Sequence, residues 1–189
     1  MDLQIAVFIN KLGAGTFIDQ LSIIISNKPF LVGLWLVLLI TTCALNKKNR
    51  YTIFWAASIS IIIYFSINDW FFKDFLSNFF ELRIRPYLAY PDLIAPLGVR
   101  SVDASFPSGH MASTVLFVTI LIYYSTAGLA CRQKVRTRLA WLLGILFALA
   151  MAFSRIHNGM HYPTDVLVGT VLGILYGLIG IYTAKKASI

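Results

Sequence analysis

The sequence predicts an all-α protein, a polytopic membrane helix bundle with about five transmembrane helices. Hydrophobic residues make up 58% of the 189 residues and charged residues only 13%, whereas soluble domains hold about 45–50% apolar and about 25% charged residues. Apolar stretches long enough to cross a bilayer also recur along the chain. The length allows one domain over residues 1–189. Any chemistry therefore has to come from the membrane unit and its loops.

Five apolar stretches approach or reach the roughly 20 residues, within about 17–25, that a membrane-crossing helix needs. Each lacks an internal charge, and they cover residues 29–45, 51–67, 111–130, 139–153 and 166–184. The fourth stretch is short and needs flanking residues or a thin bilayer. We therefore expect the transmembrane bundle to occupy residues 29–184.

Residues 1–28 show a different pattern. Apolar residues recur at helical spacing from Leu3 to Leu12, and Gly13 and Gly15 then interrupt the pattern before a second short apolar run follows Asp19. We expect two amphipathic helices that lie at the membrane interface rather than a span. A signal peptide is not expected, because no basic segment precedes an uninterrupted apolar stretch.

Most basic residues lie on one side of the predicted bundle, and all acidic residues lie on the other. With five spans, one side holds nine basic and no acidic residues: Lys47, Lys48, Arg50, Arg132, Lys134, Arg136, Arg138, Lys185 and Lys186. All eight acidic residues fall on the other side: Asp2, Asp19, Asp69, Asp74, Glu81, Asp92, Asp103 and Asp165. Basic loops face the cytoplasm, so we expect connections 68–110 and 154–165 to face the periplasm or exterior of a bacterial inner membrane. The net charge of +8 then reflects orientation, and no nucleic-acid partner is expected.

One polar segment on the expected outer side opens the third apolar stretch, as Pro107-Ser108-Gly109-His110. Proline and glycine shape a turn there, and the unpaired backbone N–H groups of the following helix form a site for phosphate or another oxyanion. An ordinary serine N-cap explains Ser108 equally well. It does not explain His110, since a positive imidazole in the first turn opposes the helix dipole.

A second polar segment places His161 four residues before Asp165, which opens the last apolar stretch. The carboxylate could accept a hydrogen bond from Nδ1–H of His161 and leave Nε2 free as a nucleophile. The alternative is a helix N-cap at Asp165 with His161 merely exposed. Arg85 and Arg155 add two cations on the same side, which indicates a phosphate site. Phosphoryl transfer in such a site needs no metal, and without any CxxC or HExxH spacing we expect neither metal nor cofactor.

These segments match the site pattern of the type 2 phosphatidic acid phosphatase (PAP2) family, which the chain resembles. That pattern consists of K-x6-R-P, then P-S-G-H, then S-R-x5-H-x3-D. The second and third blocks are complete at residues 107–110 and 154–165. The first block is partial, because Arg85 and Pro86 match but Asn78 stands at the lysine position. The resemblance covers most of the chain and implies an integral membrane lipid phosphatase.

The resemblance also implies a role for each matching residue. His161 is expected to be the nucleophile that forms a phosphohistidine, Asp165 to orient it, and His110 to protonate the leaving lipid oxygen. The expected ligands of the phosphate oxygens are Arg85, Ser108, Gly109 and Arg155.

Two further residues take their expected roles from the same pattern. Asn78 keeps an amide donor but lacks the family charge, and we expect Arg83, rather than Lys73, to replace that charge because Arg83 lies two residues from Arg85. His157 has no family role and is expected to be an exposed loop histidine.

The implied substrate is a lipid phosphate or diphosphate in the bilayer, and we favour the undecaprenyl diphosphate type. A lipid A 1-phosphatase or a phosphatidylglycerol phosphate phosphatase is the alternative, and the oligomeric state stays open. From other classes, a non-catalytic lipid-binding protein would leave the intact histidines unexplained, and a haloperoxidase does not fit the membrane architecture. A transporter would be favoured by charges within the spans, and the spans have none.

Overall fold

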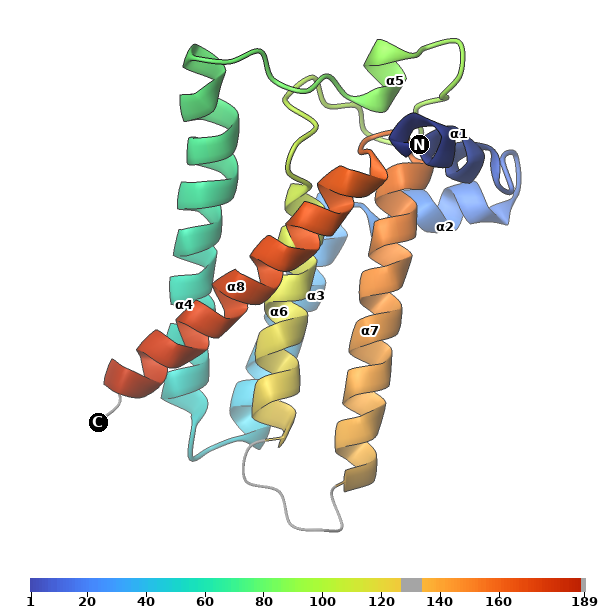
Figure 1. Ribbon diagram of the computed structural model, residues 1–189. Helices are drawn as coiled ribbons and strands as arrows, with labels where there is room; N and C mark the ends of the chain where they lie inside the picture. The colour runs from blue at the N-terminus through green and yellow to red at the C-terminus, as the bar shows by residue number, and fades with distance from the viewer. Residues whose placement is uncertain (127–133, 188–189) are drawn as a thin grey trace.

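The structure, a computed structural model, describes residues 1–126 and 134–187. Its helices are α1 (Asp2–Lys11), α2 (Phe17–Ile25), α3 (Lys28–Leu45), α4 (Arg50–Tyr64), the π-helix η1 (Phe65–Phe75), the 3-10 turn η2 (Leu76–Asn78), α5 (Pro86–Ala89), α6 (Gly109–Thr126), α7 (Lys134–His157) and α8 (Pro163–Ala187). Figure 1 shows α3, α4, α6, α7 and α8 as the rods of a bundle, with α1, α2 and α5 gathered at one end. We call this end, where α6 and α8 begin, the capped end.

The prediction of an all-α membrane bundle is confirmed. Four helices within the described ranges are long and apolar enough to cross a membrane, Lys28–Leu45, Arg50–Asn78, Arg138–His157 and Pro163–Ala187, and Gly109–Ser125 is a shorter apolar helix. The five predicted stretches fall on these five helices, except that residues 127–130 lie outside the described part of the chain. The fourth stretch is longer than predicted because α7 begins at Lys134, and lysine and arginine are good helix formers even where they interrupt an apolar pattern.

The second span also extends further than predicted. The chain stays helical from Arg50 to Asn78, although the sequence indicated a loop from residue 68 onward. Its last part is the 11-residue π-helix η1, a rare geometry with i→i+5 hydrogen bonds that is found most often at functional sites. A Cβ atom added to Gly109 would lie 2.8 Å from the hydroxyl of Tyr64 and 3.2 Å from Nδ2 of Asn68. The junction of α4 and η1 therefore packs directly against the start of α6.

Helix α8 approaches α6 so closely that only glycine fits at the contact. A Cβ atom at Gly169 would lie 2.6 Å from the backbone oxygen of Ser108, and one at Gly173 would lie 2.5 Å from that of Ala112. Small residues four apart allow this close helix packing in membranes. The contact brings the two helix starts together, and the backbone N–H of Ser108 donates to the backbone oxygen of Asp165 over 3.2 Å.

The two N-terminal helices are attached to α7 through buried polar groups. His157 is buried, with Nδ1 2.8 Å from the backbone oxygen of Ile9 and Nε2 2.9 Å from Oδ1 of Asp19. Asn10 donates from Nδ2 to the backbone oxygens of Ala95 and His157 over 2.8 and 2.7 Å. The expectation that His157 is an exposed loop residue is therefore wrong, because α7 extends to this position and α1 and α2 cover it (Figure 1). The placement of α1 and α2 at a membrane interface stays a prediction.

We expect Gly169→Ala to destabilise the protein, because the new methyl group would overlap the backbone oxygen of Ser108. Overpacking of about 1–2 kcal/mol corresponds to a melting temperature lowered by about 3–6 °C in a chain of this size. Thermal unfolding in detergent measures the shift. Gly33→Ala on α3 is the matched control, since nothing lies within 4 Å of a Cβ there, and an equal melting temperature for the two variants would contradict the packing argument.

Candidate active site

A cavity of about 340 Å³ lies at the capped end and gathers residues from all three polar segments. Its lining includes Arg85, Gly109, His110, Arg155 and His161. These residues come from the loop before α5, the start of α6, the end of α7 and the connection to α8. The structure thus brings together most of the site residues predicted from the sequence, at a volume that suits a phosphate group and part of its leaving group.

His161 lies at the floor of this cavity, and its side chain is buried. Its Nδ1 lies 2.6 Å from the backbone oxygen of Ser105. A carbonyl oxygen only accepts, so Nδ1 carries the hydrogen and Nε2 carries the lone pair, which faces Nη1 of Arg85 at 3.3 Å. Burial, followed by the positive charges of Arg155 and Arg85, holds the pKa of His161 well below its ordinary value. The ring is therefore neutral and suited to act as a nucleophile.

Asp165 does not hold His161 by the direct hydrogen bond that the sequence suggested. Its Oδ2 lies 3.9 Å from Nδ1 of His161, beyond hydrogen-bond range. Oδ2 instead accepts from Oγ of Ser105 over 2.5 Å and from the backbone N–H of Tyr162 over 2.9 Å. Ser105 therefore stands between the two residues, and Asp165 positions the histidine through it.

Arg83 is engaged in holding helices together. Its guanidinium contacts Oδ2 of Asp2 at 2.5 Å and Oδ1 of Asp165 at 2.6 Å, and it lies 3.8 Å from the centre of the Tyr162 ring. These contacts join α1 to the start of α8. The expectation that Arg83 replaces the missing family lysine is therefore not supported by its geometry.

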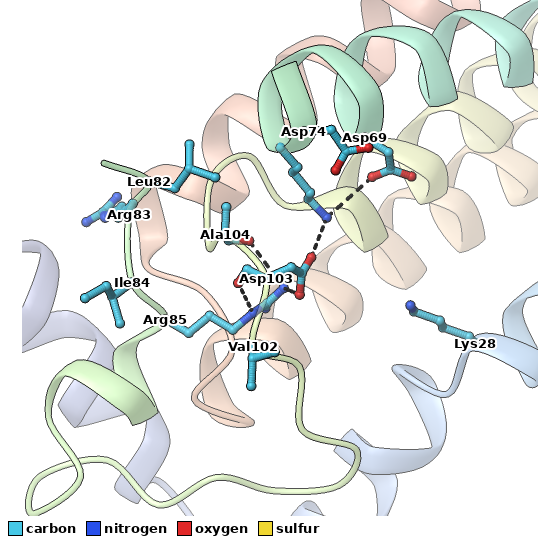
Figure 2. Close-up of a pocket in the computed structure, with 11 residues that line it drawn as sticks. Lys28, Asp69, Asp74, Leu82, Arg83, Ile84, Arg85, Val102, Asp103 and Ala104 are labelled. Atoms are coloured by element: carbon cyan, nitrogen blue, oxygen red, sulfur yellow. Dashed lines mark hydrogen bonds and ion pairs between the residues drawn. The ribbon is translucent and has the colours of Figure 1, made fainter. Parts of the chain in front are cut away.

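Lys73, and not Asn78, lines the cavity together with Arg85. Asn78 is exposed, and its amide donates to the backbone oxygens of Asp74 and Phe75 in its own helix, both over 3.2 Å. Nζ of Lys73 lies 3.0 Å from Oδ2 of Asp103, while Oδ1 of Asp103 accepts from Nη2 of Arg85 over 2.8 Å. Figure 2 shows the contact between Asp103 and Arg85 in an adjoining cavity of about 470 Å³, which Lys73 also lines.

Asp103 is the counter-ion of these two cations. Burial alone would raise its pKa, but a hydrogen bond from the Ser101 hydroxyl and the charges of Lys73 and Arg85 outweigh that effect and lower the pKa well below its usual range. The carboxylate thus stays ionised and holds Lys73 and Arg85 in place.

Arg155 and Ser108 have buried polar atoms that other side chains do not satisfy. Nε of Arg155 and Oγ of Ser108 are buried and have no hydrogen-bond partner among the described residues. A buried cation without a counter-ion costs several kcal/mol, so these groups indicate an anionic ligand. Their closeness to the start of α6, with its unpaired N–H groups, favours phosphate.

His110 borders the same cavity with its ring orientation fixed. Its Nε2 lies 3.0 Å from the backbone oxygen of Ser26, in the connection between α2 and α3. The carbonyl accepts, so Nε2 carries a hydrogen and Nδ1 is the ring nitrogen that can exchange a proton. Ser26 and Asp103 were missed from the sequence as contributors to the site, and Lys73 was considered only as the second choice after Arg83.

The bundle and its buried cations define a helical membrane protein with an anion site at one end. A sequence model of the PAP2 superfamily matches residues 53–189, and the chain belongs to that superfamily. The family prediction made from the motifs is thereby confirmed.

Two relatives and two solved structures give the range of similarity. The "bacitracin transport permease protein BcrC" of Bacillus licheniformis is 34% identical over 108 residues, covering 55% of this chain and 45% of its own length. The "undecaprenyl-diphosphatase BcrC" of Bacillus subtilis is 29% identical over 106 residues, covering 56% and 48%. The chain thus spans less than half the length of these relatives.

Among solved structures, Aquifex aeolicus LpxE aligns with a TM-score of 0.61 at 22% identity, over 96% of this chain and 94% of its own. A PAP2-type phosphatidylglycerolphosphate phosphatase from Bacillus subtilis aligns with a TM-score of 0.64 at 22% identity, over 97% and 83%. These two similarities establish the fold.

We expect Lys73→Gln to weaken binding of orthovanadate, a phosphate analogue, about fivefold or more, because it removes a charge beside Arg85. Asn78→Ala is expected to change the dissociation constant less than about twofold, since the Asn78 amide is bonded within its own helix. Titration calorimetry of the purified protein in detergent measures both values. A larger loss of vanadate affinity for Asn78→Ala than for Lys73→Gln would show that residue 78, and not Lys73, contributes to anion binding.

Proposed function

We propose that this protein is a phosphatase that hydrolyses a lipid phosphate or diphosphate through a phosphohistidine on His161. The observation that carries the proposal is the pair of buried guanidinium groups, Arg85 and Arg155, that line the same cavity as His161, with Nη1 of Arg85 3.3 Å from the unprotonated Nε2. Two positive groups around a neutral nucleophile provide what phosphoryl transfer needs, charge neutralisation and in-line attack. Membership of the PAP2 superfamily supports the same chemistry.

The reaction proceeds in two balanced steps. Nε2 of His161 attacks phosphorus, the bond from phosphorus to the leaving oxygen breaks, and its electron pair stays on that oxygen, which takes a proton from His110. Water then attacks the phosphohistidine, the phosphorus–nitrogen bond breaks, and inorganic phosphate leaves while His110 recovers the proton. Arg85, Arg155 and the N-terminus of α6 hold the phosphate oxygens in both steps.

Undecaprenyl diphosphate is the substrate we favour, because the Bacillus subtilis relative carries the name of an undecaprenyl-diphosphatase. Other relatives are named phosphatidylglycerophosphatase B, in Bacillus subtilis, and lipid A 4'-phosphatase, in Porphyromonas gingivalis. A phosphatidylglycerol phosphate or a lipid A phosphatase is therefore the second candidate.

The proposed orientation places the site outside the cytoplasm. Basic residues such as Lys47, Arg50 and Lys185 belong to the bundle end opposite the site, where α3 ends, α4 begins and α8 ends (Figure 1). Basic segments stay on the cytoplasmic side of a membrane. The site then faces the periplasm or exterior of a bacterial inner membrane, and the substrate's tail remains in the outer leaflet.

His161→Ala is expected to abolish phosphate release from a panel of purified lipid phosphates, a loss of at least about a thousandfold, because the covalent intermediate cannot form. Orthovanadate is expected to inhibit the wild-type protein, and EDTA to leave its rate unchanged. A phosphohistidine is labile to acid, so we expect no acid-stable phosphate label on the protein. The labelled protein is therefore trapped and analysed in alkali. Full phosphate release by His161→Ala would overturn the proposal.

The pH dependence of kcat/KM is expected to be bell-shaped, with its acid limb below the ordinary histidine value of about 6.5. The acid limb lies at this low pH because the pKa of His161 is lowered. The ring therefore loses its proton and becomes a nucleophile at a lower pH than a free histidine does. Initial rates with two substrates whose phosphates ionise differently separate this limb from substrate ionisation. An acid limb at or above 6.5 that is the same for both substrates would contradict the neutral state of His161.

A further inference from the structure

An apolar groove leads away from the candidate active site between α3, α4 and α6. It has a volume of about 440 Å³, and its walls are apolar side chains that include Leu31, Trp35, Ile61, Leu116 and Phe117. Such a lining suits a hydrocarbon chain. The groove occupies the part of the bundle that the bilayer surrounds, so a lipid tail can enter it without leaving apolar surroundings.

The groove and the polar cavity meet at a neck. Four residues line both spaces: Lys28, Tyr64, Asp69 and His110. His161, Arg85 and Arg155 line the polar cavity beyond this neck. A lipid whose tail lies in the groove and whose terminal phosphate reaches His161 must therefore pass Lys28 and His110.

Lys28 is the unneutralised cation of this neck. It is the first residue of α3, and Figure 2 shows its side chain directed toward the cavity without a bonded partner. Asp69, the acidic residue at the neck, lies 3.4 Å from Nζ of Lys73 and is already paired. Within residues 1–126 and 134–187, no ion pair or hydrogen bond engages Nζ of Lys28.

The position of Lys28 relative to the reacting groups indicates what it binds. In the proposed mechanism His161 attacks from the polar cavity, and His110, at the neck, protonates the leaving group. The leaving group therefore lies between His110 and the groove, beside Lys28. In a lipid monophosphate this part of the molecule is an uncharged alcohol, which gives a lysine no anion to neutralise. In a lipid diphosphate it is the second phosphate, which carries the tail.

We infer that Lys28 binds the tail-bearing phosphate of a lipid diphosphate and selects diphosphates over monophosphates. This inference rests on the proposed function. The terminal phosphorus transfers to Nε2 of His161, and its bond to the bridging oxygen breaks. The electron pair stays on that oxygen, which remains with the lipid monophosphate and receives the proton of His110. Lys28 neutralises the charge that the departing phosphate carries.

A lysine at the end of a span also has a plainer role, as an anchor that extends to the membrane surface. An anchor would affect the binding of every substrate alike, since it acts on the position of α3. A group that binds the leaving phosphate affects only substrates that have one. The ratio of activities on a diphosphate and a monophosphate with the same tail therefore separates the two roles.

The experiment compares kcat/KM for undecaprenyl diphosphate and undecaprenyl phosphate in detergent, for the wild-type protein and three variants. Lys28→Met, which removes the charge and keeps the stem, is expected to lower the diphosphate-to-monophosphate ratio about tenfold or more. Lys28→Arg, which keeps the charge, is expected to restore most of the ratio. Lys11→Met, an exposed lysine of α1, is the matched control and is expected to leave the ratio unchanged.

Inorganic probes give a second measurement that does not depend on the tail. Lys28→Met is expected to weaken inhibition by pyrophosphate about tenfold relative to inhibition by orthophosphate. Unchanged ratios in both measurements, with melting temperatures that show folded variants, would overturn the role of Lys28 and leave the proposed function standing. No phosphate release from any lipid by the wild-type protein would instead overturn the proposed function and this inference with it.

Discussion

The contact between Ser105 and Asp165 is the interaction on which the rest of the site depends. Oγ of Ser105 donates to the carboxylate of Asp165 at the start of α8, and the backbone oxygen of Ser105 accepts from Nδ1 of His161. One residue thus joins the loop before α6 to the loop before α8. The glycine contact between α6 and α8 makes this possible, because it brings the two helix starts within hydrogen-bond distance. The packing of α6 against α8 therefore also determines how the ring of His161 is oriented.

The charges of the site follow from burial. Arg85 and Arg155 are both withdrawn from solvent, but only Arg85 has a carboxylate, Asp103, among its partners. The site as folded is therefore short of negative charge on the side of Arg155 and His161. In the proposed function a substrate phosphate supplies that charge, and its binding offsets the free-energy cost of burying Arg155. Burial, together with the same surplus of positive charge, keeps the pKa of His161 well below its ordinary value and the ring neutral.

The sequence alone predicted the bundle and the five site residues that line the cavity, Arg85, Gly109, His110, Arg155 and His161. His110, Arg155 and His161 each stand near an end of an apolar stretch, Arg85 lies in the connection between the second and third stretches, and alternating spans bring these segments to the same side. The contacts of Asp165 could not be predicted, because they depend on the path of the loop that inserts Ser105. The choice of Lys73 over Arg83 as the cation beside Arg85 could not be made from the sequence either. It depends on η1 continuing the helix beyond residue 67, and no spacing rule for apolar residues reveals a π-helix.

Residues that approach the lipid tail and residues that bind the transferred phosphate lie in different parts of the chain, and this separation indicates where substrate preference is determined. The matched superfamily segment, residues 53–189, contains every residue that we propose to act on the transferred phosphate. It does not contain α3, which forms one wall of the apolar groove, or Ser26, which orients the ring of His110. Lys28 also lies before this segment. Under the proposed function, residues 1–52 shape the approach of the lipid and orient the general acid, while the matched segment carries the groups that cleave the phosphate. A change of substrate between relatives is expected to arise in the N-terminal part, because the groove and neck can change there without disturbing the buried cations and His161.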